Sequence, residues 1–179
     1  VTARLPTGDS VDVLLYGATV LSWKSQGGQT ENLWLSEAAK LDGTKAVRGG
    51  IPVVFPVFGP PPPNHATSSL AQHGFARTSR WEFLGKSTSE DAADSASVKL
   101  DFGLYSSNLP EEARKAWPHD FSLVYSVTLG KDSLQTVMNV RNEGSEVFEF
   151  QMLLHTYLRV KVRIPPLPTS FPCAEAFAG

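Results

Sequence analysis

Hydrophobic residues alternate with polar ones over long stretches of this chain, which is the two-residue period of half-buried β-strands. Every second position is apolar across residues 98–104, and the same holds for FSLVYSVTL at 121–129. The turn residues 130–133 and the return segment LQTVMNV at 134–140 then predict a β-hairpin. A third strand is expected over Val147–Val160, and it would complete an antiparallel meander.

Shorter segments in the first half of the chain repeat this pattern less regularly. Strands are expected over 11–16, 19–24, 32–35 and 80–84. Helix signals are few. Leu109–Ala116, with Asn108 as its N-cap, has acidic residues early and basic residues late, and Ser36–Leu41 is predicted as one helical turn. The pattern therefore predicts an all-β fold, a sandwich or barrel-like stack of antiparallel sheets.

Three segments carry no strand pattern. Gly59–Asn64 (GPPPPN) is a polyproline loop, and Ser87–Ser97 is a polar loop. From residue 162 the chain reads VRIPPLPTSFPCAEAFAG, and proline cannot donate to a sheet ladder. We therefore expect residues 1–161 to form the N-terminal portion of a single β-sandwich domain. Residues 162–179 are expected to be a proline-rich tail outside the native fold, as in a truncated chain.

Composition and charge exclude several classes of protein. The chain has 179 residues and a net charge of -2, so electrostatics give no support for nucleic acid or an anionic membrane as a partner. No apolar run reaches the roughly 18 residues of a membrane span. The single cysteine, Cys173, excludes an internal disulfide and a cysteine-based zinc site. With no leader segment visible, the cytosol is the expected location.

Three groups of polar residues stand in apolar or glycine-rich surroundings. Arg48 precedes two glycines, so a small anion can approach its guanidinium closely. Gln72, His73 and Arg77 lie within six residues and offer an amide, an imidazole and a guanidinium to a polyhydroxylated or anionic ligand. His155 lies inside an apolar strand segment, where an imidazole can exchange a proton near neutral pH.

Each of these groups also has a structural interpretation. Arg48 can be a loop arginine paired with a surface acid, His73 can cap backbone groups, and His155 can be a hydrogen-bonded core histidine. Trp117–Phe121 (WPHDF) is interpreted as a structural corner. Phosphate loops, HExxH, GxSxG and EF-hand patterns are absent from the sequence, so no metal or cofactor is expected.

A set of motifs, in this order and spacing, resembles a known family. They are YGAT (16–19), Trp23, LWLS (33–36), KAVRGGIPVVFPVFG (45–59), QHGFAR (72–77), WEF (81–83), Trp117-Pro118 and HTY (155–157). Together they resemble the hexose-6-phosphate mutarotases, or glucose-6-phosphate 1-epimerases, a branch of the aldose 1-epimerase-like superfamily. The resemblance covers most of residues 11–160.

The resemblance implies an antiparallel β-sandwich of the galactose-mutarotase type, incomplete in this chain. It implies a monomeric cytosolic enzyme, without metal or cofactor, that interconverts the α and β anomers of an aldohexose 6-phosphate. Arg48, Gln72 and Arg77 match sugar-phosphate contacts of the family, and His73 matches a sugar contact. His155 matches the catalytic histidine, which handles the proton of the ring oxygen.

The chain departs from the family at its C-terminal end. The family's catalytic glutamate and a sugar-binding aspartate lie in a C-terminal portion that this sequence lacks, and Glu175 matches neither. We therefore expect the chain to fold poorly or to associate, and to be nearly inactive. Two alternatives stay open: a non-catalytic carbohydrate-binding module that stacks sugars on Trp23, Trp34 or Trp81, and an interaction fragment whose polyproline loop binds an SH3- or WW-type partner.

Overall fold

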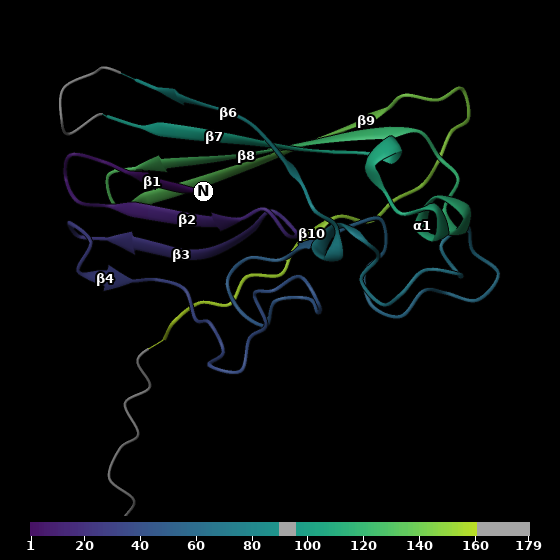
Figure 1. The fold of residues 1–179 in the computed structure, drawn as a ribbon, viewed down its shortest axis with the longest axis horizontal. Coiled ribbons are helices and arrows are strands. Elements are labelled where there is room, and N and C mark those ends of the chain that lie inside the picture. The colour runs from purple at the N-terminus through teal and green to yellow at the C-terminus, as the bar shows by residue number, and fades with distance from the viewer. Residues whose placement is uncertain (90–95, 161–179) are drawn as a thin grey trace, which may run out of the picture.

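The structure, a computed structural model, describes residues 1–89 and 96–160, and the strands in them form three antiparallel sheets (Figure 1). The first sheet consists, in spatial order, of β1 (Thr2–Arg4), β2 (Ser10–Leu14), β3 (Thr19–Ser25) and β4 (Thr30–Glu31). The second consists of β6 (Glu82–Thr88), β7 (Val98–Tyr105), β8 (Phe121–Gly130) and β9 (Ser133–Asn142). The third pairs β5 (Val53–Val54) with β10 (Leu153–Leu154). The expected all-β antiparallel class is confirmed.

The predicted β8–β9 hairpin forms, with Gly130 opposite Ser133 at its turn. Buried and partly exposed residues alternate without a break along β8, as its sequence predicts. The buried residues of β8 and β7 belong to the same core cluster as Val11, Val13 and Val20 of the first sheet. The two four-stranded sheets therefore share a single hydrophobic core.

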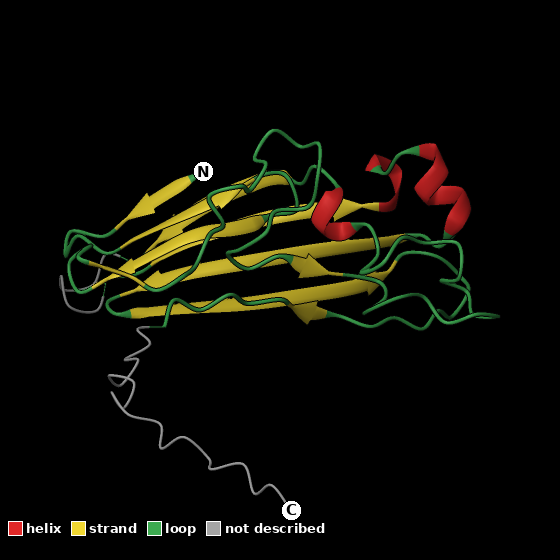
Figure 2. Ribbon diagram, turned by 90° about the horizontal axis from the view of Figure 1, so that it is seen from below, coloured by secondary structure: helices red, strands yellow, loops and turns green. Residues whose placement is uncertain are grey.

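An aromatic cluster lies beside the helical turns, because Phe75 precedes η1 (Ala76–Thr78) and Trp117 follows α1 (Glu111–Ala116), and these turns lie at one end of the sheets (Figure 2). The ring of Phe55, which directly follows β5, lies 5.9 Å from Phe75, 5.6 Å from Trp117 and 5.5 Å from Phe121, measured between centroids. Three helical turns stand around this end: η1, η2 (Ser106–Asn108) and α1. Phe55 thus connects the short sheet to the second large sheet.

The prediction of a third strand in the meander is wrong. Only Leu153–Leu154 of the segment 147–160 forms a strand, and it pairs with β5 instead of β9. Phe148 packs on Trp117 at 4.9 Å, and Phe150 packs on Phe55 at 5.4 Å. Because the chain carries these two rings into the aromatic cluster, it leaves the edge of β9 and crosses to the short sheet.

Smaller differences concern the ends of elements. The predicted strand 80–84 begins at Glu82 and continues to Thr88, so it includes the first residues of the expected polar loop. Segment 32–35 makes isolated bridges, and 36–41 is not helical. The α1 helix has the expected charge order, but its N-cap is Pro110 rather than Asn108. The proposed tail at 162–179 lies outside the described residues.

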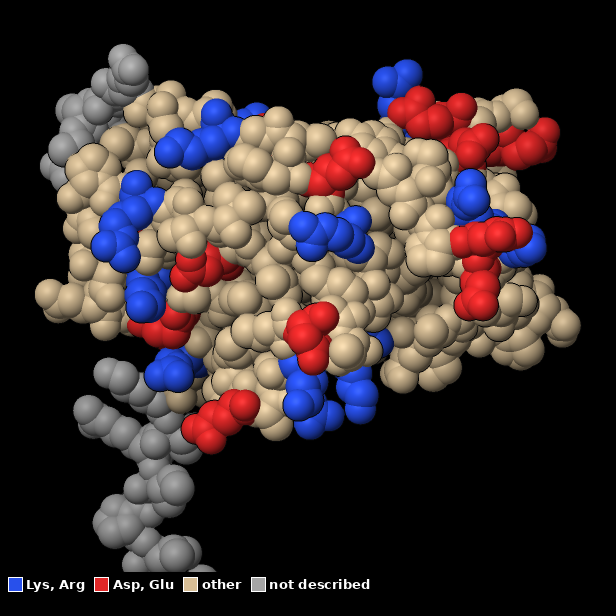
Figure 3. Space-filling model, viewed as in Figure 1, with Lys and Arg blue, Asp and Glu red and all other residues tan. Residues whose placement is uncertain are grey.

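Acidic and basic side chains are interspersed on the face seen in Figure 3, with wide uncharged areas between them. Among the residues that the structure describes, none of the helices has the length and apolar character needed to cross a membrane.

Phe55→Ala should lower the free energy of unfolding by about 3–5 kcal/mol, because it removes a fully buried ring that packs on four other rings. Urea unfolding followed by tryptophan fluorescence measures this change. Phe83→Ala is the control, since that β6 ring is 42% exposed and its loss should cost less than about 1 kcal/mol. Equal midpoints for the two variants would contradict a central role for Phe55.

Candidate functional site

Three segments far apart in the sequence meet in a closed ring of backbone hydrogen bonds. The amide of Gly50 donates to the carbonyl of Trp34 at 2.8 Å, Trp34 donates to Tyr157 at 2.9 Å, and Tyr157 donates to Gly50 at 2.9 Å. Isolated bridges extend the ring on both sides, between Leu35 and Gly49 and between Leu33 and Leu158. This ring, called the backbone ring below, joins the RGGIP, LWLS and HTY motifs.

Gly50 permits the backbone ring because no side chain fits at this position. Its φ is 64°, and a Cβ atom there would lie 2.1 Å from the carbonyl oxygen of Val20. This close approach also allows a hydrogen bond, since the amide of the next residue, Ile51, donates to the Val20 carbonyl at 2.8 Å. The glycine therefore allows three chain segments and β3 to approach at one point.

His155 lies next to the backbone ring and is half-buried. Its amide donates to the carbonyl of Pro52 at 2.9 Å, which continues the pairing of β10 with β5. Its imidazole stacks on Tyr157 with centroids 4.8 Å apart, as the alternation of an extended chain predicts for residues i and i+2. The imidazole of His155 also makes a T-shaped contact with that of His73, with centroids 5.9 Å apart.

His73 is held in a left-handed backbone conformation, with φ 69°. Two hydrogen bonds to Gly59 fix it: the His73 amide donates to the Gly59 carbonyl, and the Gly59 amide donates to His73 Nδ1, both at 3.1 Å. Nδ1 is an acceptor, so the neutral ring carries its proton on Nε2. Burial lowers the pKa of His73, and the charges of Arg77 and His155 lower it further.

Arg77, in η1, is a half-buried cation without an acidic partner among the described residues. Its Nη2 donates to the carbonyl of Gln72 at 2.9 Å, while its buried Nε has no hydrogen-bond partner there. Burial lowers the pKa of the guanidinium, and Tyr157 and Tyr16 oppose that shift. A buried donor without a partner typically costs about 1–3 kcal/mol, so the site favours an added acceptor.

The structure thus brings together three of the five residues predicted from the sequence, His73, Arg77 and His155. Gln72 is beside them, but its side chain is exposed, and it is its backbone carbonyl that accepts the hydrogen bond from Arg77. Arg48 is exposed two residues before the backbone ring, and within residues 1–89 and 96–160 its guanidinium has no hydrogen bond or ion pair.

Sequence reasoning assigned no role to Tyr157, Tyr16 or Phe58, which also border the site. Tyr157 could have been found from its i+2 spacing to His155. The other two are placed at the site by tertiary contacts. Phe58 packs on His73 with ring centroids 5.2 Å apart, and burial raises the pKa of the Tyr16 hydroxyl, a shift that the charge of Arg77 opposes.

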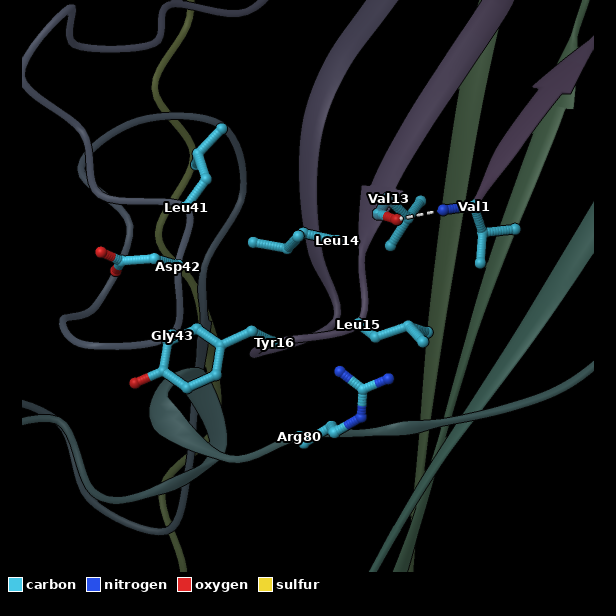
Figure 4. A pocket seen from close by; sticks show the side chains of 9 residues that line it. All are labelled: Val1, Val13, Leu14, Leu15, Tyr16, Leu41, Asp42, Gly43 and Arg80. Carbon is cyan, nitrogen blue, oxygen red and sulfur yellow. Dashed lines mark hydrogen bonds between the residues drawn. The ribbon is translucent and has the colours of Figure 1, made fainter.

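A cavity of about 460 Å³ lies between the end of β2 and the loop at 41–43, and none of the five predicted residues lines it (Figure 4). Tyr16 stands beside Asp42 and Gly43 in this cavity. Burial raises the pKa of Tyr16, the charge of Asp42 raises it further, and Arg77 opposes both. Tyr16 therefore links this cavity electrostatically to the candidate site. Within the described part of the chain, His, Cys, Asp and Glu side chains form no group of three that could bind a metal ion.

Comparisons with known proteins identify the family and the fold of this chain. The sequence profile described as aldose 1-epimerase matches residues 1–168. The chain belongs to the aldose 1-epimerase family. Within this family, it is 41% identical over 146 residues to an Escherichia coli protein named "Putative glucose-6-phosphate 1-epimerase". The matched region covers 82% of this chain and 44% of that protein. A Cenchrus ciliaris protein of the same name is 33% identical over 165 residues, covering 88% and 47%.

Solved structures give the same result for the fold. A structure titled as a putative mutarotase from Salmonella typhimurium superposes with a TM-score of 0.72 at 32% identity, covering 89% of this chain and 48% of that one. A galactose mutarotase-like protein from Lactobacillus casei shares the fold, with a TM-score of 0.63 at 19% identity. The galactose-mutarotase type of sandwich is confirmed. The chain spans about half the length of the aldose 1-epimerase relatives it matches.

In this aldose 1-epimerase family chain, Gly50→Ala should destabilise the fold more than Gly59→Ala does. Both glycines have similar positive φ values, 64° and 71°, so both variants pay the left-handed penalty of about 1–2 kcal/mol. Only the added Cβ at position 50 meets a backbone oxygen, while nothing lies within 4 Å at position 59. Urea unfolding of both variants measures the difference, and equal losses would show that the close approach at Gly50 is unimportant.

His73 should titrate below its ordinary pKa of 6.5, and Arg77→Gln should raise its pKa toward that value. Below about pH 6.5 the unfolded chain therefore binds a proton at His73 more readily than the folded chain does. The contribution of His73 to the free energy of unfolding is full above about pH 6.5 and is lost as the pH falls through the folded-state pKa. NMR titration of the His73 ring measures the shift. Arg80→Gln is the matched control, since Arg80 is not among the charges that act on His73. An unchanged His73 pKa in Arg77→Gln would refute the coupling.

Proposed function

We propose that this chain binds an aldohexose 6-phosphate, with glucose 6-phosphate as the expected substrate, and contributes acid–base groups to the interconversion of its anomers. The observation that carries this proposal is Arg77. A half-buried guanidinium with a buried, unpartnered Nε and no nearby carboxylate among the described residues calls for an anionic ligand. The neighbouring imidazoles and tyrosines offer the hydroxyl-binding groups that a sugar needs.

In this proposal the two arginines bind the 6-phosphate. Arg77 is fixed by its bond to the Gln72 carbonyl, whereas the exposed Arg48 is free to reach the outer phosphate oxygens. The amide of Gln72 and the Nε2–H of His73 contact sugar hydroxyls. His73 is suited to a binding role, because its lowered pKa keeps the ring neutral and its proton fixed on Nε2.

His155 is proposed to exchange a proton with the ring oxygen. When that oxygen is protonated and the C1 hydroxyl loses its proton, the C1–O5 bond breaks and an open-chain aldehyde forms. Rotation about C1–C2 and attack by O5 on the other face of the aldehyde give the second anomer. The stacking of His155 on Tyr157 and its contact with His73 limit the orientations of the imidazole.

The proton of the C1 hydroxyl requires a base on the opposite side of the ring. No carboxylate is among the described groups that shift the pKa of His73 or Arg77. We therefore propose that the described residues supply the phosphate and ring-oxygen half of the reaction. Turnover that relied on the described residues alone should be slow, because an acid–base pair without one member loses about 100-fold or more.

A carbohydrate-binding module remains the second candidate, and the exposure of Trp34 supports it. Trp81 is 1% exposed, so the idea that it stacks on a sugar is wrong. A lectin for neutral sugars would not need Arg77, which makes this residue the point where the two candidates differ.

Arg77→Gln should weaken the binding of glucose 6-phosphate roughly ten- to hundredfold, the equivalent of losing a charged hydrogen bond worth about 1.5–3 kcal/mol. Isothermal titration calorimetry measures the affinity, and two-dimensional exchange NMR of the anomeric protons measures any interconversion. His155→Gln should leave the affinity within about threefold and abolish whatever exchange the parent chain catalyses.

Arg80→Gln controls for the loss of one positive charge near η1. The phosphosugar function would be wrong if Arg77→Gln and Arg80→Gln bound glucose 6-phosphate equally well. It would also be wrong if methyl glucoside, which has no phosphate, bound as tightly as glucose 6-phosphate.

A further inference from the structure

Trp34 is unusual among the four tryptophans of this chain because its ring is on the surface. It is 39% exposed, whereas Trp81 and Trp117 are each 1% exposed and Trp23 is half-buried. Scattered surface apolar residues need no explanation by themselves. Trp34 differs from them because its backbone is fixed on both sides by the backbone ring, so its position is set by the same hydrogen bonds that set Tyr157.

The exposed indole begins a continuous row of rings that leads into the candidate site. Trp34 lies 5.8 Å from Tyr157 at an interplanar angle of 33°, and Tyr157 lies 4.8 Å from His155 at 24°. These three rings therefore form a stack, in which Tyr157 lies against His155 and the exposed indole of Trp34 is the outer member. The imidazole of His73 lies next, with its plane at 77° to that of His155, and Phe58 packs on His73.

We propose that the exposed indole of Trp34, held in place by its contact with Tyr157, is a stacking platform for the apolar face of a pyranose ring. This inference rests on the proposed function for its orientation, since a phosphate on Arg77 would anchor the far end of the same sugar. Tyr157, on which Trp34 packs, also has an electrostatic interaction with Arg77.

An exposed indole face distinguishes cyclic from open-chain sugars. A pyranose presents several C–H groups on one face, which can cover an aromatic ring and remove apolar area from water. A linear polyol phosphate has no such preformed face and must lose rotational freedom to imitate one. The platform would thus favour the two ring anomers over an acyclic analogue with the same phosphate.

The test compares the affinities of four probes for the full 179-residue chain: glucose 6-phosphate, methyl glucoside, glucitol 6-phosphate and inorganic phosphate. Trp34→Ala should weaken the two pyranoses roughly three- to tenfold and leave glucitol 6-phosphate and phosphate unchanged. Trp34→Phe, which keeps a ring, should recover most of the affinity. Glucose 6-phosphate should also change the tryptophan fluorescence of the parent chain, and that change should be lost in Trp34→Phe.

Phe83→Ala is the matched control, because Phe83 is a similarly exposed aromatic residue on β6. The platform is overturned if Trp34→Ala leaves the pyranose affinities unchanged, or if it weakens all four probes equally, as general loss of structure would. It is also overturned if the parent chain binds neither pyranose. If Arg77→Gln has no effect while Trp34→Ala weakens both pyranoses, the platform stands and the phosphosugar function fails.

Discussion

The arrangement of this site depends on the backbone ring that joins Gly50, Trp34 and Tyr157. Each of these residues belongs to a different motif, and each motif alone is only a short extended segment. The ring brings the segments to hydrogen-bonding distance without a long strand in any of them. Its geometry requires a residue without a side chain at position 50, where β3 passes directly against the backbone. Packing and chemistry therefore depend on one glycine.

Electrostatics at the site follow from what the chain places near Arg77. Its neighbours are aromatic rings and imidazoles, so the positive charge is not compensated within the described residues. Burial lowers the pKa of His73, and the charge of Arg77 lowers it further, so both favour the neutral imidazole. In the proposed function, the same guanidinium would attract the anionic ligand and favour a neutral His73. A surface ion pair with an aspartate or glutamate would cancel both.

The strands with strict two-residue alternation were predictable, because along β7 and β8 burial on one face decides both the element and its register. The path of residues 147–160 was not, because two phenylalanines are drawn into an aromatic cluster that local sequence does not reveal. At the site, motif spacing predicted the polar residues, of which the structure brings His73, Arg77 and His155 together. The contribution of Tyr16 and Phe58 and the backbone role of Gln72 depend on tertiary contacts, which have no sequence signal.

The left-handed backbone of His73 limits which residues can replace it during evolution. Asparagine, aspartate and glycine tolerate that conformation, whereas β-branched and most bulky residues do not. Of these three, asparagine alone keeps a neutral side-chain acceptor that can receive the amide of Gly59. Relatives without a histidine at this position are thus expected to have asparagine there. The proline loop that starts at Gly59 would then keep its hydrogen bond to this side chain, although the imidazole is lost.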